Sequence, residues 1–134
     1  MLRALTPASI HPPFARYSHG VEVPPGARLV FLSGQLGIAA DAAIPEGAEA
    51  QTELIFDAME AILAEARLGL RHVVRLNAYL AGREHLAAYM AVRDRRVGEP
   101  PPASTLLIVS GFSREAFKVE VEAVAAGPAV TSGG

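Results

Sequence analysis

Two acidic residues near the end of the chain have a spacing that suits acid–base chemistry. In the run Val119-Glu120-Val121-Glu122-Ala123, apolar and charged residues alternate, so on a strand both carboxylates point to the same side. A carboxyl group that is buried without a cation holds its proton more tightly than usual. Such a group can exchange protons with a substrate near neutral pH. Glu120 is the preferred acid–base candidate, and the alternative is a solvated glutamate on an edge strand.

Four further residues could line a ligand site. Tyr17 offers a ring wall and a hydroxyl, and Ser104 and Thr105 offer two more hydroxyls. Gly34 interrupts an apolar run, which indicates either a β-bulge or a place where another group approaches the backbone closely. The alternative for the other three is an ordinary strand residue that packs or pairs across the sheet. Sequence alone leaves both interpretations open.

The sequence gives no reason to expect a metal or a cofactor. There is no cysteine, which excludes disulfides, thiolate catalysis and cysteine-bound metals. The histidines are scattered through unrelated segments without ligand spacing, at positions 11, 19, 72 and 85. We therefore predict no metal site and no cofactor.

Hydrophobic periodicity predicts an alternation of strands and helices within a single domain, residues 1–134. Apolar residues at helical spacing predict helices over residues 48–66 and 84–97. Gly69 fits the left-handed residue that often follows a helix. We expect an irregular arm over residues 1–13 and an irregular tail after Gly127, flanking a core of about 14–126. Alternating or β-branched runs predict strands over residues 14–23, 28–39 (bent at Gly34, and forming a hairpin with the first), 73–80, 105–109 and 117–125.

Two helices can cover only one face of a sheet of this size. The composition is apolar, with 51% hydrophobic and 19% charged residues. An uncovered apolar face costs about 25 cal/mol for each Å² left in water. We therefore expect the open face of the sheet to be covered by other copies of the chain.

Charge and hydropathy exclude several classes of partner. A net charge of −2 argues against a general nucleic-acid binder. No apolar run approaches the roughly 18–20 residues that span a bilayer, so no membrane partner is expected. The N-terminus lacks a basic region followed by an apolar core, and a cytoplasmic protein is the expectation.

The ordered set of segments resembles the RidA/YjgF family, which also carries the label endoribonuclease L-PSP. The match covers roughly residues 14–126. No single motif is specific, but their order along the chain is. The segments are Tyr17-Ser18-His19-Gly20-Val21, Phe31-Leu32-Ser33-Gly34-Gln35, Val74 to Leu80, and a closing hairpin of Pro102-Ala103-Ser104-Thr105 with Val119 to Ala123.

The resemblance implies a chorismate-mutase-like α+β fold, with a mixed, mostly antiparallel sheet and two helices on one face. It implies a homotrimer in which the sheets form a central barrel and small-molecule clefts lie between subunits. The better-studied branch hydrolyses imines and enamines derived from amino acids. In that branch an Arg before the penultimate strand binds the substrate carboxylate and a Glu on the last strand, here Glu120, activates water. Backbone groups near the Ser33-Gly34 turn assist.

The chain departs from this pattern at two positions. Ser104 stands where the family has its Arg, and Met90 stands where the deaminating branch often has a polar residue on the second helix. An Arg fork binds a carboxylate through two charge-assisted hydrogen bonds, so its loss predicts about 10- to 100-fold weaker carboxylate binding. Four arginines could each supply a cation from another position, and the sequence does not choose among them: Arg16, Arg28, Arg75 and Arg93.

Two functions remain open at this point. The first is an imine or enamine hydrolase in which Glu120 orients water and Tyr17, Ser33, Gly34, Met90, Ser104 and Thr105 line the cleft. The second is a non-catalytic metabolite-binding or regulatory protein that kept the cleft and lost the chemistry. Ribonuclease activity is disfavoured because the chain has no basic patch, no aromatic stacking platform and no paired histidines.

Overall fold

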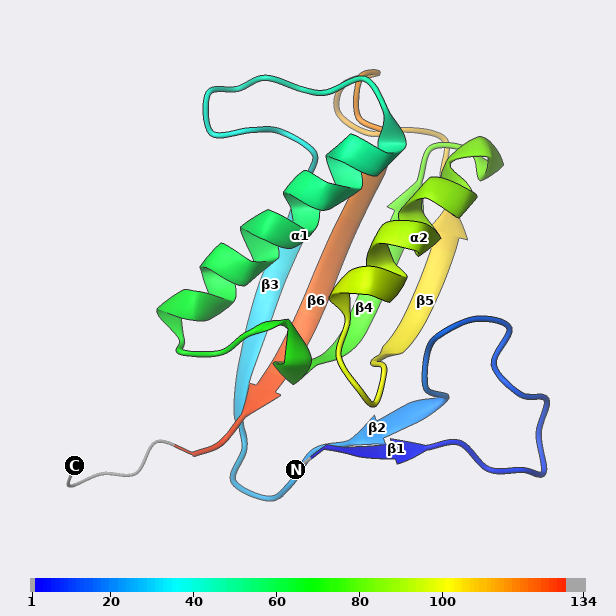
Figure 1. Cartoon of the computed structure of the whole chain (residues 1–134), viewed down its shortest axis with the longest axis vertical. Helices are drawn as coiled ribbons and strands as arrows, with labels where there is room; N and C mark the ends of the chain where they lie inside the picture. Colours follow the sequence, from blue (N-terminus) through cyan, green and yellow to red (C-terminus); the bar gives the residue numbers. More distant parts are fainter. Residues whose placement is uncertain (1, 130–134) are drawn as a thin grey trace.

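The computed structural model describes residues 2–129. Within them the chain forms two sheets and two α-helices (Figure 1). None of these helices is long and apolar enough to cross a membrane. In chain order the elements are β1 (Arg3–Leu5), β2 (Gly20–Glu22), β3 (Arg28–Leu36), α1 (Ala48–Glu65), η1 (Leu70–His72), β4 (Val73–Leu80), η2 (Arg83–His85), α2 (Leu86–Arg96), β5 (Ala103–Ile108) and β6 (Val119–Gly127).

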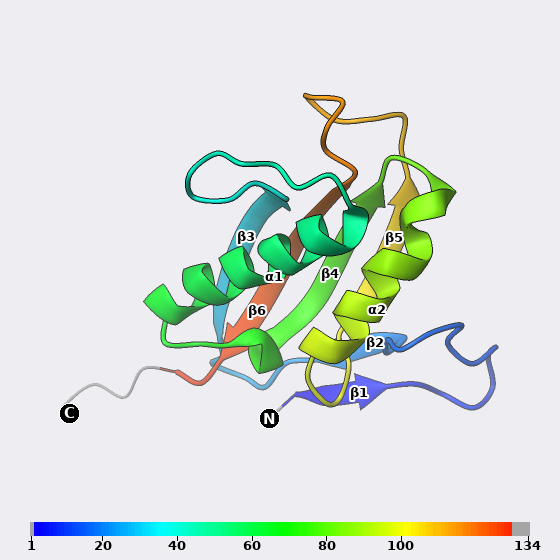
Figure 2. The same cartoon turned by 45° about the horizontal axis from the view of Figure 1, so that its top comes forward.

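The main sheet is mixed and has the strand order β3-β6-β4-β5. β6 pairs antiparallel with both β3 and β4, and β4 pairs parallel with β5. A parallel pair needs a crossover, and α2 supplies it. Figures 1 and 2 show α1 and α2 side by side on the same face of this sheet. The expected α+β fold with two helices on one face is confirmed.

The core lies between the two helices and the sheet. Val119, Val121 and Ala125 of β6 are buried, as the alternating pattern predicts. From α1, Ile55 and Phe56 are fully buried against them. On the outer side, Arg96 of α2 pairs with three carboxylates of α1 and so ties the two helices together; these are Glu53, Asp57 and Glu60.

The start of β4 differs from its predicted orientation. The alternation over residues 73–80 predicts that Val74, Leu76, Ala78 and Leu80 point inward, but Val74 is only half-buried and Val73 is buried in its place. The pairing of β4 with β6 shifts register between Val73 and Arg75, which turns the first residue toward the core. From Leu76 onward the predicted alternation is confirmed.

Three predictions for the N-terminal third are wrong. The strand predicted over residues 14–23 shrinks to Gly20–Glu22, which pairs with Arg3–Leu5 rather than with β3. The predicted hairpin is therefore absent from residues 2–129, and part of the supposedly irregular arm is a strand. Ser18 explains the shortening, because its amide and hydroxyl bind the carbonyls of Pro102 and Pro101 and hold this segment beside β5.

Other predicted boundaries also need correction. β5 and β6 form no hairpin, because β4 lies between them. Gly69 is not the left-handed residue after α1; Arg67 holds that conformation, with φ of 58°. A 3₁₀ turn, η2, precedes α2 and accounts for the helix predicted from residue 84. The predicted irregular tail falls largely on residues 130–134, outside the described residues.

The face of the main sheet opposite the helices is uncovered by residues 2–129 and carries large apolar side chains. Phe31 is 73% exposed, Leu29 52% and Leu107 51%. Monomeric proteins seldom expose such clustered apolar surface, which is typical of an interaction site. We call this surface the open face.

Candidate functional site

The two carboxylates of β6 lie on the open face and differ in their surroundings. Glu122 accepts hydrogen bonds from Asn77 Nδ2 (3.2 Å) and from the Tyr79 hydroxyl (2.7 Å). Both donors come from β4, the neighbouring strand. Within residues 2–129 Glu120 makes no side-chain hydrogen bond, although it is half-buried. Its lone pairs are therefore free to hold a water molecule or a substrate proton.

The hydrogen bond between Glu122 and Tyr79 has an electrostatic consequence. It stabilises the neutral phenol beside a carboxylate and is the main reason that the pKa of Tyr79 is raised, with desolvation and the charge of Glu122 adding to it. Among the described residues, Glu122 thus has side-chain hydrogen-bond partners and Glu120 has none. This difference singles out Glu120 as the carboxylate available for chemistry.

Gly34 lies directly under the Glu120 side chain. The pairing of β3 with β6 shifts register between Leu32 and Gln35, so the predicted bulge is present. A Cβ built on Gly34 would lie 2.5 Å from Glu120 Oε2 and 2.9 Å from Glu120 Cδ. The group that closely approaches the Gly34 backbone is therefore the Glu120 side chain. Ser33 is exposed beside it, and its carbonyl accepts a hydrogen bond from Gln35.

These residues border a hollow of 350 Å³ that we call the strand hollow. It has two carboxylates and a phenol on one side and the turn after β5 on the other. The lining residues are Gly34, Tyr79, Val109, Gly111, Phe112, Glu120 and Glu122.

A second hollow, of 300 Å³, gathers three other predicted site residues: Tyr17, Met90 and Ser104. We call it the helix hollow. Ser104 is in register with the core residue Leu76 on the parallel neighbour, so its side chain faces α2 and not the open face. The other lining residues are Phe14, Ala15, Leu86, Arg93 and Leu106.

The segment before β2 positions Tyr17. The Ser18 amide donates to the Pro102 carbonyl (3.1 Å), and the Ser18 hydroxyl donates to the Pro101 carbonyl (2.6 Å). The hydroxyl oxygen of Tyr17 accepts a hydrogen bond from the Phe14 amide at 3.3 Å, which leaves its proton free for a ligand.

Thr105 does not share the helix hollow with Ser104. It is in register with Asn77 on the open face, and its hydroxyl accepts a hydrogen bond from Arg75 Nη2 at 2.7 Å. Two consecutive strand residues point to opposite faces, so Ser104 and Thr105 cannot line one wall. The structure thus divides the predicted site residues between the two faces of the sheet.

The structure distinguishes the four arginines that the sequence left open. Arg16 binds the carbonyls of residues 94, 97 and 98 and the Glu99 carboxylate. Arg28 binds the carbonyls of residues 66 and 128, and Arg75 binds Thr105. Of these four, Arg93 alone lines the helix hollow. Its spacing from Met90, three residues along a predicted helix, was the signal in the sequence that could have identified it.

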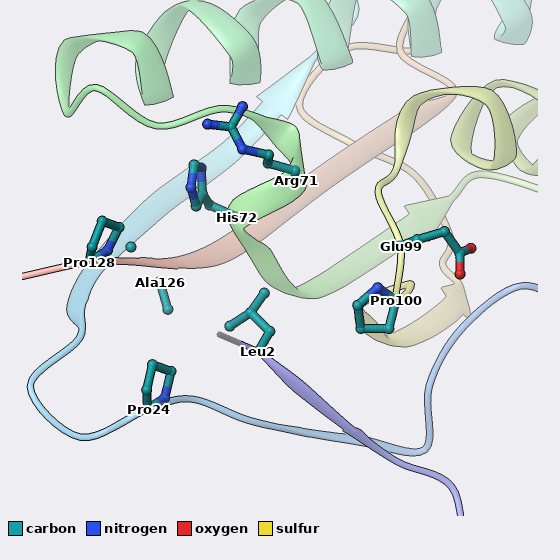
Figure 3. A pocket seen from close by; sticks show the side chains of 9 residues that line it. Leu2, Pro24, Arg71, His72, Glu99, Pro100, Ala126 and Pro128 are labelled. Atoms are coloured by element: carbon teal, nitrogen blue, oxygen red, sulfur yellow. The ribbon is translucent and has the colours of Figure 1, made fainter.

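A third hollow, of 460 Å³, contains none of the predicted site residues (Figure 3). Leu2, Pro24 and Pro100 form much of its wall, and the Glu99 side chain points away from the others. His72 is also there, with its pKa lowered first by burial and then by the charge of Arg71. Because its walls are mainly apolar and its acid lies turned away, this hollow is not the candidate site.

No three His, Asp or Glu side chains within residues 2–129 come together in a metal-binding cluster. The strand hollow and the helix hollow instead offer a free carboxylate, hydroxyl groups and one guanidinium.

The chain is similar in sequence and in fold to known proteins. The family model described as endoribonuclease L-PSP matches residues 8–127. Protein HMF1 of Saccharomyces cerevisiae is 30% identical over 130 residues, covering 94% of this chain and 98% of the yeast protein. Protein DfrA of Myxococcus xanthus is 34% identical over 113 residues, covering 81% and 83%.

Solved structures agree. YyfB of Yersinia pestis, described as a Rid-family protein of unknown function, superimposes with a TM-score of 0.77 at 26% identity, covering 92% of this chain and 97% of YyfB. RidA of an Antarctic Psychrobacter gives a TM-score of 0.69 at 30% identity, with 90% and 92% covered. The resemblance read from the sequence is confirmed: the chain belongs to the endoribonuclease L-PSP family, the Rid or YjgF proteins.

Proposed function

We propose that the chain forms a homotrimer in which the helix hollow of one subunit and the strand hollow of the next join into a single cleft, and that this cleft hydrolyses an imine or enamine metabolite. The observation that carries the proposal is the division of the site residues between two faces of one sheet. Tyr17, Met90 and Ser104 lie on the helix side, whereas Gly34 and Glu120 lie on the open face. Within one chain the sheet separates the two groups.

The exposed apolar side chains of the open face support a subunit contact there. Covering Phe31, Leu29 and Leu107 removes apolar area from water at about 25 cal/mol per Å². A rotationally symmetric assembly would bring the open face of each subunit against its neighbour and repeat the same cleft at every contact.

The reaction needs a water molecule and one proton acceptor. Glu120 would hold a water molecule and accept one of its protons as the water oxygen attacks the C=N carbon, and it would then pass that proton to the nitrogen to give a carbinolamine. Transfer of the carbinolamine hydroxyl proton to the nitrogen would break the C–N bond, release ammonia and leave a carbonyl. The hydroxyl groups of Tyr17 and Ser104 would hydrogen-bond the substrate from the facing side. Glu122 would stay bound to Tyr79 and Asn77 and keep the local backbone fixed.

The alternative, a metabolite-binding protein without turnover, is favoured by a specific observation. The helix hollow has Ser104 and Met90 where the deaminating branch has its polar side chains, and Leu86 and Leu106 make the walls apolar. At these two positions the pocket offers one neutral hydroxyl and a thioether, which polarise a substrate less than the charged and polar groups of the deaminating branch.

A coupled assay of ammonia and 2-oxo acid formation tests the proposal, with 2-imino acids generated in place by an amino acid oxidase. Glu120→Gln keeps the shape of the side chain and removes its charge, so we expect the rate to fall about 10²- to 10⁴-fold. Glu122→Gln is the matched control two residues away and should retain most of the rate. Equal rates for wild type and Glu120→Gln would reject the hydrolase and leave the binding protein.

A further inference from the structure

Arg93 is an unusual residue for the position it occupies. Its side chain is only 4% exposed, yet it borders the helix hollow together with Tyr17, Met90 and Ser104. Among the described residues that line this hollow, Arg93 is the one with a charged side chain. A buried guanidinium is costly unless a partner compensates its charge.

The compensation within residues 2–129 is incomplete. Arg93 Nε and Nη2 both donate to one oxygen, Asp94 Oδ1, at 3.1 and 3.0 Å. Asp94 is the next residue in the chain and its side chain is 42% exposed, so water screens its charge. The guanidinium carbon lies 5.9 Å from the centre of the Tyr89 ring, which adds a weak cation–π contact.

One edge of the guanidinium remains available. Nη1 makes no side-chain hydrogen bond within residues 2–129. Among these residues the Tyr89 hydroxyl is the fully buried side-chain polar atom that lacks a partner, so Nη1 is not sealed inside the protein. Because Arg93 borders the helix hollow, this free donor edge is accessible to a ligand there.

We propose that Arg93 is the carboxylate-binding residue of the cleft, reaching it from α2 rather than from β5. This inference rests on the proposed function, since it assumes that the helix hollow is the ligand side of the site. Ser104 on β5 is small, and the Arg93 side chain borders the same hollow from α2. The ligand class that fits is a small carboxylate with a short apolar chain, with the charge on Arg93 and the chain against Met90 and Leu106.

The location of Arg93 also changes the expectation for position 104. An arginine placed there would enter a hollow that already contains one guanidinium, and two like charges in a poorly hydrated site repel. Ser104→Arg should therefore weaken folding or expel one of the two side chains rather than simply restore the family pattern.

Calorimetric binding of 2-oxobutanoate and of its uncharged amide tests the inference. For Arg93→Met we expect about 10- to 100-fold weaker binding of the carboxylate, while binding of the amide changes by less than about 2-fold. Arg95→Met removes an exposed arginine from the same helix and should leave both affinities unchanged. Unchanged carboxylate binding in Arg93→Met, an equal loss for the amide, or no binding of 2-oxobutanoate to wild type would overturn the inference.

A second variant keeps the test valid if Arg93→Met does not fold. Asp94→Asn keeps an acceptor oxygen for the guanidinium but removes the neighbouring negative charge that competes with a bound carboxylate, so carboxylate binding should tighten about 2- to 5-fold; unchanged or weaker binding would contradict the inference. Because these measurements follow binding and not turnover, they separate the two proposals. A protein that binds the carboxylate through Arg93 without hydrolysing imines would keep this inference and reject the hydrolase.

Discussion

The two faces of the main sheet present hollows of opposite chemistry. On the helix side, an apolar pocket contains one guanidinium and the hydroxyls of Tyr17 and Ser104. On the open face, two carboxylates and the Tyr79 phenol border a shallower hollow. The first resembles a place where an anion binds, and the second a place where a proton is accepted. Neither is a complete site, which is the reason for proposing that they meet between subunits.

The contrast extends to stability. The helix side is packed, whereas the open face leaves Phe31 in water. Residues of the same type should therefore behave differently on the two faces, and substitutions on each face test this difference.

The largest effect is expected for Phe56→Ala in α1. Phe56 is fully buried, and removing its ring loses the transfer energy and leaves a cavity. Denaturant unfolding should show a loss of about 3–5 kcal/mol. A loss below about 1 kcal/mol would mean that the helix side is not the core.

Phe31→Ser on the open face should have a different result. The residue contributes little within one subunit, so the unfolding free energy of the subunit should change by less than about 0.5 kcal/mol. If the open face is the subunit contact, association should weaken about 100-fold or more, as expected for a buried aromatic anchor. Sedimentation over a range of concentrations measures this. Unchanged association would show that the open face faces solvent.

Gly34→Ala tests the close contact within the strand hollow. The added Cβ would lie 2.5 Å from Glu120 Oε2, so the carboxylate must move. We expect a stability cost of about 1–3 kcal/mol, typical of overpacking, and a loss of any Glu120-dependent rate. Gly26→Ala is a control at a glycine with nothing near its Cβ position, although its φ of +78° adds backbone strain. A fully active Gly34→Ala variant would show that Glu120 does not take part in the reaction.

Glu122→Gln should change the titration of Tyr79. The hydrogen bond to Glu122 raises the pKa of Tyr79 by stabilising the neutral phenol next to a carboxylate. Removing that charge should lower the Tyr79 pKa, so the phenol deprotonates at a lower pH than in wild type. NMR titration of labelled tyrosine measures the direction, and an upward shift would contradict the assigned partner.

The smallest effect is expected for Tyr89→Phe on the helix side. The Tyr89 hydroxyl is buried without a hydrogen-bond partner within residues 2–129, and burial raises the pKa of Tyr89 to about 12. Removing an unsatisfied hydroxyl is neutral or stabilising, so unfolding should become harder by about 1 kcal/mol or less. A marked loss of stability would reveal a partner for this hydroxyl in the assembled protein.

Local periodicity was enough to predict the elements with strong patterns. The helix predicted over residues 48–66 forms over Ala48–Glu65, and the alternation of β6 is confirmed, because both depend on spacing within one segment. Pairing partners depend on distant segments. The sequence therefore missed that β2 pairs with β1 and that β4 separates β5 from β6.

The residues of the candidate site could likewise be predicted only where the signal lies within one segment. The bulge at Gly34 and the side shared by Glu120 and Glu122 could be read from the sequence. Arg93 was left among four candidate arginines: its spacing from Met90 on a predicted helix was a usable signal, but only the packed structure shows that it shares a hollow with Ser104. The opposite orientation of Ser104 and Thr105 follows from strand alternation and could have been predicted.

Cross-linking between two single-cysteine variants tests the shared cleft most directly, because the native chain has no cysteine. Ser104→Cys and Glu120→Cys chains would be mixed, allowed to exchange subunits, and treated with a short bis-maleimide. We expect a cross-linked dimer on a denaturing gel in the mixture and none with either variant alone. A mixture that folds and exchanges subunits but yields no such dimer would contradict the claim that the two hollows meet between subunits.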